Sequence, residues 1–343
     1  MTRRGVICGG CWLVDHNKTV QDWPAEETLT TILAQETDGG GPAHNMAMDL
    51  ARLDPSLPLW AMGALGRDRE GELILGWCRE RGIDASRFRV LDEVGTSYTD
   101  VMTDARTGKR TFFHYQGANA ALTPEDFDFG DIPARILHLG SPGIHARMDA
   151  PWGEDANGWV TVLKQARAAG LHTNLEMISA APDELQRLTT PCLEHLDSLI
   201  INDFEAGALT GLELVTPSGT SIDAARRAAE ALLDMAPLGL VVIHFPMGCV
   251  AASREGERLV LPSLNVPPAE IRGANGAGDA FAAGVLYGLH EAWPLERSLR
   301  LGFSAAAAAL RSVSTTHAVA TKDECLALAE TWGWRETAAA PRR

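Results

Sequence analysis

The feature that most constrains the fold of this chain is a regular alternation of short apolar runs with longer amphipathic segments. The apolar runs have the length of strands, and the amphipathic segments repeat apolar residues at helical spacing. We predict strands at 5–11, 59–65, 136–139, 171–175, 198–201, 240–244 and 250–253. We predict helices at 43–53, 70–81, 157–169, 182–188, 204–210, 222–235, 277–291, 295–311 and 322–332. This order predicts a mostly parallel sheet with helices on both faces, whose ligands bind beyond the carboxyl ends of the strands.

Two stretches interrupt this alternation. Residues 14–38 read as irregular extended chain, and residues 96–115 read as a hairpin with its turn at 105–108. We predict that segments 13–38 and 95–117 form a small β-sheet lid within a single domain, 1–336, followed by a disordered tail at 337–343. The alternative is a pair of long surface loops, but the aromatic residues of the second segment favour an ordered lid or a dimer contact.

Composition narrows the class of protein. The net charge of −15 disfavours a nucleic-acid or anionic-membrane surface. We see no apolar run of membrane-spanning length and no signal peptide, so we expect a cytoplasmic protein. Cys8 and Cys11 have the spacing of a redox or metal half-site, but there is no second such pair and both lie in a predicted buried strand. We therefore favour a structural interpretation of these two cysteines.

A turn of small residues, Gly276-Ala277-Gly278-Asp279, leads directly into a predicted helix. Glycine and alanine leave the backbone N–H groups at a helix start unshielded, and such a start attracts anions. A carboxylate there would repel a phosphate, but it makes sense if it takes a proton during phosphoryl transfer. The motif therefore indicates phosphoryl transfer onto a hydroxyl with Asp279 as the base, against the alternative of ordinary helix capping.

Other polar residues fit the same edge of the sheet. Gly39-Gly40-Gly41 opens a helix in which Asn45 can both donate to and accept from a hydroxyl, although a flexible turn would have the same sequence. Asn202 and Glu205 follow a strand and suit a hydrated Mg²⁺ with phosphate oxygens, or else a helix cap. Asp15, just past the first strand, would lie at the same edge, or would be a solvated loop acid.

In combination, these motifs resemble those of the ribokinase-like, PfkB-type sugar and nucleoside kinases over nearly the whole chain. The matching runs appear in the family's order: Gly40-Gly41 with Asn45, Gly66-Arg67-Asp68-Arg69-Glu70-Gly71, Gly117-Ala118-Asn119-Ala120-Ala121-Leu122-Thr123-Pro124, Asn202-Asp203-Phe204-Glu205-Ala206 and Gly276-Ala277-Gly278-Asp279-Ala280-Phe281. The resemblance implies a three-layer α/β/α fold with a β-sheet lid, and an ATP-dependent carbohydrate kinase that uses Mg²⁺ and dimerises through the lid.

The resemblance also implies roles for single residues. Asp279 would be the base, and the turn formed by Gly276, Ala277 and Gly278 would hold the anion. The sugar hydroxyls would contact Asp15, Gly40, Gly41 and Asn45. The nucleotide side would be formed by Asn202, Glu205, His244, Gly248 and Asn275, with Asn202 and Glu205 also near Mg²⁺.

This chain departs from the family pattern at three places. Gly273 lacks a carboxylate that helps to hold a monovalent cation, so a K⁺ requirement is doubtful. Pro246 stands in the nucleotide loop 244–249 where a glycine is usual, and it removes one N–H donor. Gly140 stands where ribokinase-like members often carry a glutamate that contacts the sugar.

Alternative functions stay open at this point. A nucleoside kinase on the same fold is the runner-up, since Asn275 precedes the anion turn and the lid aromatics could stack on a base. A non-catalytic sugar-binding protein with an impaired ATP site would account for the altered loop 244–249. A nicotinamide dehydrogenase is disfavoured, because Cys8-Gly9-Gly10-Cys11 lacks the G-x-G-x-x-G spacing.

Overall fold

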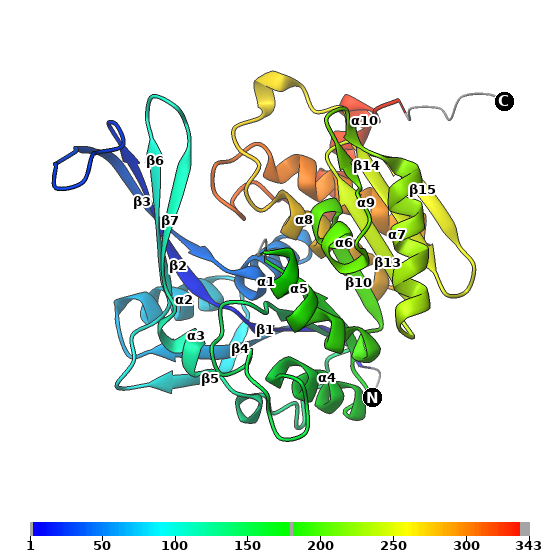
Figure 1. The fold of residues 1–343 in the computed structure, drawn as a ribbon, viewed down its shortest axis with the longest axis horizontal. Coiled ribbons are helices and arrows are strands. Elements are labelled where there is room, and N and C mark those ends of the chain that lie inside the picture. Colours follow the sequence, from blue (N-terminus) through cyan, green and yellow to red (C-terminus); the bar gives the residue numbers. More distant parts are fainter. Residues whose placement is uncertain (1–2, 179–180, 337–343) are drawn as a thin grey trace.

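The structure is a computed structural model that describes residues 3–178 and 181–336, so the tail predicted at 337–343 lies outside the described residues. A nine-stranded sheet forms its centre (Figure 1). Its order is β15 (Arg258–Pro262), β14 (Gly248–Ser253), β13 (Leu240–Phe245), β10 (Ser198–Asn202), β9 (His172–Glu176), β8 (Ile136–Gly140), β1 (Val6–Gly10), β4 (Leu59–Gly66) and β5 (Asp84–Leu91). The strands from β13 to β5 pair in parallel, and β14 and β15 add an antiparallel edge.

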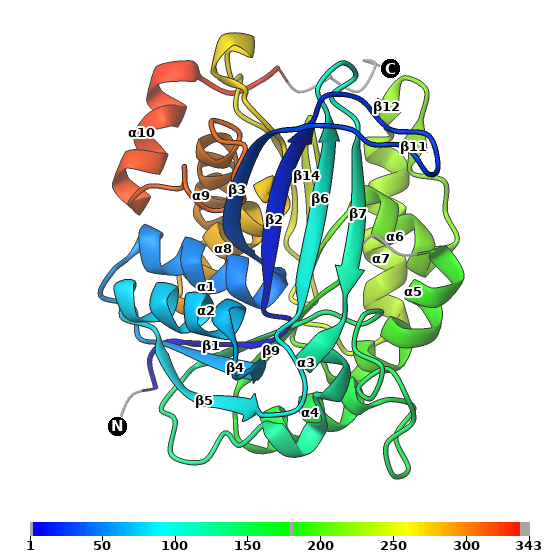
Figure 2. The same ribbon diagram turned by 90° about the vertical axis from the view of Figure 1, so that its left-hand side faces the viewer.

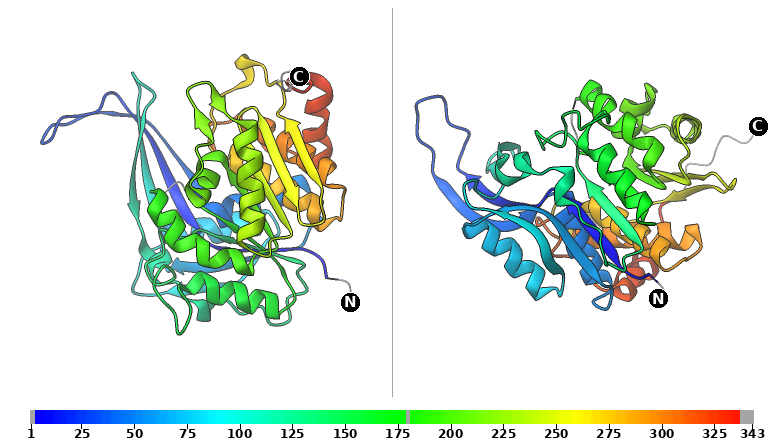
Figure 3. Two further views of the ribbon diagram at one scale, coloured as in Figure 1. Left: turned by 45° about the vertical axis from the view of Figure 1, so that its right-hand side comes forward. Right: turned by 90° about the horizontal axis from the view of Figure 1, so that it is seen from below.

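Helices cover both faces of this sheet, as the alternating pattern predicts (Figure 3). One hydrophobic cluster lies under α1 (Pro42–Leu53), α2 (Arg69–Glu80), α8 (Ala277–His290), α9 (Leu295–Ala309) and α10 (Lys322–Trp332). The other lies under α3 (Gly117–Ala121), α4 (Gly158–Ala168), α5 (Pro182–Thr189), α6 (Asp203–Thr210) and α7 (Ile222–Met235). Short 3₁₀ turns occur at Pro124–Asp126, Thr190–His195 and Pro268–Glu270, and a two-stranded ribbon pairs β11 (Val215–Thr216) with β12 (Gly219–Thr220). The three-layer α/β/α prediction is confirmed.

A second, four-stranded sheet stands beside the main body (Figure 2). Its order is β3 (Ile32–Gly40), β2 (Leu13–Val20), β6 (Tyr98–Asp104) and β7 (Arg110–Tyr115). The outer pairs are antiparallel and the central pair, β2 and β6, is parallel. We refer to this sheet as the lid. The predicted hairpin at 96–115 is present as β6 and β7.

The prediction of irregular chain over 14–38 is wrong at both ends of that stretch, where β2 and β3 form regular strands. Most residues of β2 are half-buried on both faces, and most of β3 is exposed. Neither strand therefore shows the apolar alternation that would mark it in the sequence. The edge strands β5 and β15 were missed for the same reason, because their burial is partial along most of their length.

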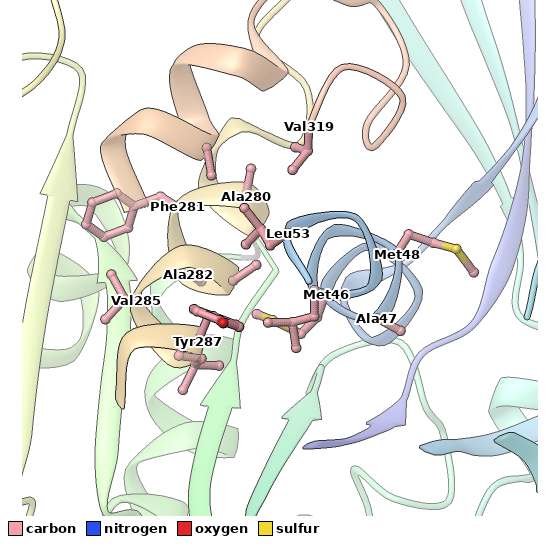
Figure 4. Packing of buried hydrophobic residues seen from close by; sticks show 14 of the residues in the cluster. Met46, Ala47, Met48, Leu53, Ala280, Phe281, Ala282, Val285, Tyr287 and Val319 are labelled. Carbon is pink, nitrogen blue, oxygen red and sulfur yellow. The ribbon is translucent and has the colours of Figure 1, made fainter. Parts of the chain in front are cut away.

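The N-terminal helix α1 packs directly against the C-terminal helix α8. Figure 4 shows Met46 and Leu53 of α1 pointing toward Ala280, Ala282 and Tyr287 of α8. Met46 and Leu53 are fully buried, and each contributes about 1.5–3 kcal/mol by leaving water. This packing sets the beginnings of the two helices beside each other at the carboxyl edge of the central strands. Among the residues that the structure describes, no helix has the length and apolarity needed to cross a membrane.

Candidate active site

The turn before α8 has the backbone that an anion site requires. Gly276 has φ 73°, in the left-handed region, and a Cβ there would overlap the carbonyl of Thr315. Only glycine fits this position without strain. The amides of Gly278 and Asp279 then fall in the first helical turn, where no helical carbonyl precedes them. The predicted turn therefore presents N–H groups at the positive end of a fourteen-residue helix.

The structure brings Asn45 and Asp279 together. Asn45 Nδ2 donates a hydrogen bond of 2.6 Å to Asp279 Oδ2, and the Thr315 hydroxyl donates to Asn45 Oδ1 at 3.2 Å. Because Asn45 Oδ1 already accepts, its amide nitrogen is the group that faces the carboxylate. The predicted sugar contact and the predicted base are therefore direct neighbours.

Asp279 is the centre of a group of buried acids. Burial raises the pKa of Asp279 well above its usual range, the nearby charge of Glu176 raises it further, and the bond from Asn45 acts in the opposite direction. Glu176 lies close enough to Asp279 for each of the two carboxyls to affect the pKa of the other. Glu176 was not predicted, although it directly follows the predicted strand 171–175 at the edge where ligands bind, and that position could have identified it.

Asp15 lies beside the glycine loop, on β2 of the lid. A Cβ at Gly40 would overlap the Asp15 carboxylate, so the loop backbone lies against that side chain. Burial raises the pKa of Asp15 to about 7, helped by the charge of Asp38 and opposed by a hydrogen bond from Thr99. Gly41 has φ 91° and precedes α1, so it too requires glycine. These residues place a buried carboxyl and two close-approach glycines at the entry to α1.

A cavity of about 590 Å³ opens on the other side of the anion turn. Ala277 and Gly278 of the turn line it, together with Asn202 and His244. Its walls are mostly apolar and are formed by Phe204, Phe245, Pro246, Leu264, Val266, Ile271, Phe281, Phe303, Ala306, Ala307 and Leu310. A mostly apolar cavity of this size, lined in part by the anion turn, has room for a nucleotide with its base against the apolar walls and its phosphates at the turn.

Other residues predicted on the nucleotide side lie outside the cavity lining. Gly248 faces the backbone of Leu261, and Asn275 lies in the turn before α8. His244 does line the cavity, with its ring against Gly278, and burial lowers the pKa of this histidine to about 4. The imidazole is therefore neutral at neutral pH and does not act there as a fixed positive charge on the phosphates.

Asn202 and Glu205 form a reciprocal cap at the start of α6. Asn202 Oδ1 accepts from the Glu205 amide at 2.9 Å, and Glu205 Oε2 accepts from the Asn202 amide at 3.0 Å. This is the helix-cap alternative considered for the motif, and it fixes Glu205 in a buried position. Burial also raises the pKa of Glu205 to about 7. Over residues 3–178 and 181–336, no group of three or more histidine, cysteine or acidic residues forms a ready metal cage.

Cys8 of β1 and Cys11, just after β1, show no sign of redox or metal chemistry. Cys8 and Cys11 are free and fully buried, and burial raises the pKa of both thiols. A thiol with a raised pKa is protonated and unreactive at neutral pH. Their burial supports the structural interpretation.

Known proteins carry the same sequence pattern and fold. The model of the pfkB family carbohydrate kinases matches residues 5–322. The 5-dehydro-2-deoxygluconokinase of Shouchella clausii is 25% identical over 334 residues, which cover 95% of each chain. Ribokinase of Arabidopsis thaliana, solved with ribose and ATP, superposes with a TM-score of 0.78 at 20% identity, over 96% of this chain and 99% of that one. A nucleoside kinase of Methanocaldococcus jannaschii superposes with a TM-score of 0.75 at 18% identity, over 96% of this chain and 99% of that chain.

The two solved structures establish the fold alone, since both are below 25% identity. The family match covers most of the chain, including the glycine loop before α1 and the turn before α8. The resemblance and the enzyme class expected from the sequence are thus confirmed: this chain belongs to the pfkB family of carbohydrate kinases.

Proposed function

We propose that this protein transfers the γ-phosphoryl group of ATP to a hydroxyl of a sugar or sugar derivative, with Asp279 as the general base. The observation that carries this proposal is the 2.6 Å bond between Asn45 and Asp279, beside the N–H groups of the anion turn. A hydroxyl held by Asn45 would lie within reach of Asp279. A phosphate held by the turn would lie within reach of that hydroxyl, as in-line transfer requires.

Different groups of this chain would carry out different parts of the reaction. Asn45 and Asp15 orient the sugar hydroxyls through an amide and a carboxyl. Asp279 takes the proton of the attacking hydroxyl, and its raised pKa suits a base that works near neutral pH. The amides of the turn stabilise charge on the transferred group. The lid excludes water, which would otherwise compete with the sugar as acceptor.

The residues near the cavity fit a magnesium ion that arrives with its nucleotide. Mg²⁺ keeps several waters and is usually bound by one or two carboxylates together with substrate phosphates, which neutralise charge as the phosphoryl group moves. Asn202 lines the cavity, and Glu205 is held behind it by the α6 cap. We assign Asn202 and Glu205 to the ion's water shell.

The named relatives suggest the class of acceptor. Several curated relatives are named 5-dehydro-2-deoxygluconokinase, and others are named ribokinase or ketohexokinase. All of these names describe kinases of small carbohydrates. We propose that the acceptor is a molecule of this size, a pentose, a hexose or a sugar acid, and that neither a protein nor a nucleic acid is the acceptor.

The lid carries exposed apolar side chains that suit an interface between two copies of this chain. Trp23 stacks on Phe113 at 6.2 Å between ring centres, and both remain about half exposed. Leu33 and Phe112 are also more than half exposed. We propose a homodimer through the lid, which sedimentation of the wild type and of Phe112→Ser would test.

All six cysteines are free, which suits the reducing cytoplasm.

ADP release from Mg-ATP tests the function across a panel of pentoses, hexoses, sugar acids and nucleosides, with and without K⁺. Turnover on one compound, lost by several orders of magnitude in Asp279→Asn with sugar binding retained, would support the proposal. Near-normal turnover in Asp279→Asn would remove Asp279 as the base. Turnover on nucleosides alone would change the acceptor class, and no ATP binding at all would favour a non-catalytic protein.

A further inference from the structure

Arg335 lines the cavity beside the anion turn, whose other walls are mostly apolar. Its Nε is buried, and within the described part of the chain this N–H group has no hydrogen-bond partner. Buried N–H groups in folded proteins are nearly always paired with a protein group, water or a ligand. The unpaired donor in the wall of this cavity therefore indicates that a bound molecule supplies the acceptor.

The backbone after α10 holds Arg335 at this place. Trp334 pairs with Leu264 in an antiparallel bridge, and the Arg335 amide donates a hydrogen bond of 2.9 Å to the Ser263 carbonyl. The Trp334 ring also packs edge-on against Phe303 of α9, another residue of the cavity wall, at 6.4 Å between ring centres. Arg335 is therefore positioned by the same elements that form the cavity.

The strand order places Arg335 away from the proposed phosphate site. His244, at the end of β13, lies against Gly278 of the anion turn, whereas Ser263 directly follows β15, two strands further along the sheet. Adjacent strands lie about 4.8 Å apart, so Ser263 is displaced from His244 by roughly 10 Å along the sheet edge. A nucleotide with its phosphates at the turn would extend along this edge, and its base is the part that would come near Arg335.

The same part of the cavity lacks a backbone donor. Pro246 lines the cavity and has no N–H group, at a position in loop 244–249 where a glycine is usual in the family pattern. Its carbonyl accepts a hydrogen bond of 2.8 Å from the Ser263 hydroxyl, and the Ser263 carbonyl accepts from Arg335. Arg335 therefore brings side-chain N–H donors to the part of the cavity where the loop has lost one.

The chemistry of a guanidinium group favours one kind of base. It carries only donors, arranged in a planar fork. Guanine presents two adjacent acceptors, O6 and N7, that match this fork, whereas adenine presents N7 beside an amino group that is itself a donor. Asp203 also lines the cavity, but its carboxylate already accepts from the Phe204 amide at 3.0 Å and from the Thr220 hydroxyl. Arg335 is therefore the charged group best placed to distinguish the two bases.

We propose that Arg335 is a specificity-determining residue that donates hydrogen bonds to the edge of the purine base, so that this cavity binds guanine nucleotides at least as well as adenine nucleotides. The inference rests on the proposed function, in which the cavity holds the phosphoryl donor, and it adds GTP to ATP as a donor. The γ-phosphoryl group of GTP passes to the same acceptor hydroxyl, and GDP leaves in place of ADP. The family model ends at residue 322, so Arg335 lies outside the pattern that this chain shares with its family.

Calorimetric titration with ADP, GDP and IDP tests the inference without a sugar acceptor. The base of IDP has the O6 and N7 acceptors of guanine but lacks its 2-amino group, so IDP should bind as GDP does. Arg335→Met keeps the apolar stem of the side chain, and it should weaken GDP and IDP binding by about tenfold. The same variant should weaken ADP binding by less than about threefold, and the ratio of kcat/KM for GTP to that for ATP should fall with the GDP affinity.

Two further variants separate the base contact from a general effect of charge. Arg335→Lys keeps the positive charge and loses the planar fork, so GDP affinity should fall in this variant as well. Arg297→Met removes an exposed arginine of α9 that does not line the cavity, and it should leave the affinity for all three nucleotides unchanged.

Equal losses for all three nucleotides in Arg335→Met would assign the guanidinium to the phosphates and overturn the inference. Wild-type binding of GDP that is clearly weaker than that of ADP would also overturn it. The inference and the proposed function fail separately. Absence of turnover with every sugar would reject the proposed function, while the titrations would still decide the role of Arg335. ATP-dependent turnover that is lost in Asp279→Asn, together with an unchanged GDP affinity in Arg335→Met, rejects only the inference.

Discussion

Asn45 Nδ2 donates a 2.6 Å hydrogen bond to Asp279 Oδ2 across a separation of 234 residues. The donor is held in place by Thr315, which donates to the other atom of the Asn45 amide. The amide proposed to hold the sugar thus also stabilises the ionised form of the proposed base. Sugar binding and proton transfer should therefore respond together when this bond is changed.

Replacing Asn45 with alanine should weaken sugar binding by about tenfold, as expected for the loss of one hydrogen bond between neutral groups. The same change removes a bond that lowers the pKa of Asp279, so the acid limb of kcat/KM should move to higher pH. Calorimetric titration with the sugar and a pH series of initial rates would measure both effects. Unchanged sugar affinity would remove Asn45 from the binding site.

Two glycines of the anion turn form a matched pair of tests. Gly276→Ala should destabilise the protein by about 2 kcal/mol or more, because φ is 73° and the new Cβ would overlap the Thr315 carbonyl. Gly278→Ala should change stability by less than about 1 kcal/mol, since its Cβ would make only an ordinary 3.4 Å contact with the His244 ring. Its methyl group would nevertheless enter the cavity and reduce ATP affinity. Urea unfolding and nucleotide titration distinguish the two, and equal stability of both variants would contradict this account.

Asp15 should make the protein less stable as pH rises. Its pKa is about 7 in the folded protein against 3.8 in the unfolded chain, so the folded state holds the proton over that interval. The cost of ionising a buried carboxyl therefore grows from about pH 4 and is complete above about pH 7. Asp15→Asn should raise the free energy of unfolding by about 2 kcal/mol at pH 8 and by clearly less at pH 5. Urea unfolding at the two pH values measures this, and an equal effect at both would show that Asp15 ionises normally.

Filling the apolar cavity should block the nucleotide and spare the sugar. Ala306 of α9 lines the cavity, and Ala306→Phe would place a ring inside it. ATP affinity should fall by at least about tenfold, while the sugar affinity stays the same. Ala327→Phe on the exposed face of α10 is the control for the added ring. Loss of sugar binding in Ala306→Phe would place the acceptor, rather than the nucleotide, in this cavity.

Most of the central fold could be predicted from the sequence because its strands are short apolar runs buried on both faces. β10 and β13, for example, are almost entirely buried, and their predicted bounds are within one residue of the observed ones. The lid strands β2 and β3 were missed as strands because β2 is mostly half-buried on both faces and β3 is mostly exposed. A half-exposed strand has no apolar face to show in the sequence, and its pairing is visible only once the partner strands are in place.

The residues of the candidate site also differ in how far the sequence could identify them. Asp279 and Asn45 could be predicted because each lies in a run of small residues that opens a helix. Glu176 comes directly after a predicted buried strand, and its place at the edge where ligands bind is the one signal that could have identified it. Its proximity to Asp279 depends on how the strands pair in the folded sheet, which the sequence does not display. The geometry of Asn202 and Glu205 also could not be foreseen, because a helix cap and a ligand pair share the same spacing.

The packing of α1 against α8 has a consequence for how the chain is made. The first helix finds its cover in a helix that begins at residue 277, and the Gly5 amide donates to His290 Nε2 across 285 residues. During synthesis, the apolar face of α1 leaves the ribosome long before the segment that buries it. The nascent chain must keep this face from aggregating until about four-fifths of the sequence has been translated, and chains released before residue 279 lack the proposed base as well as the cover of α1.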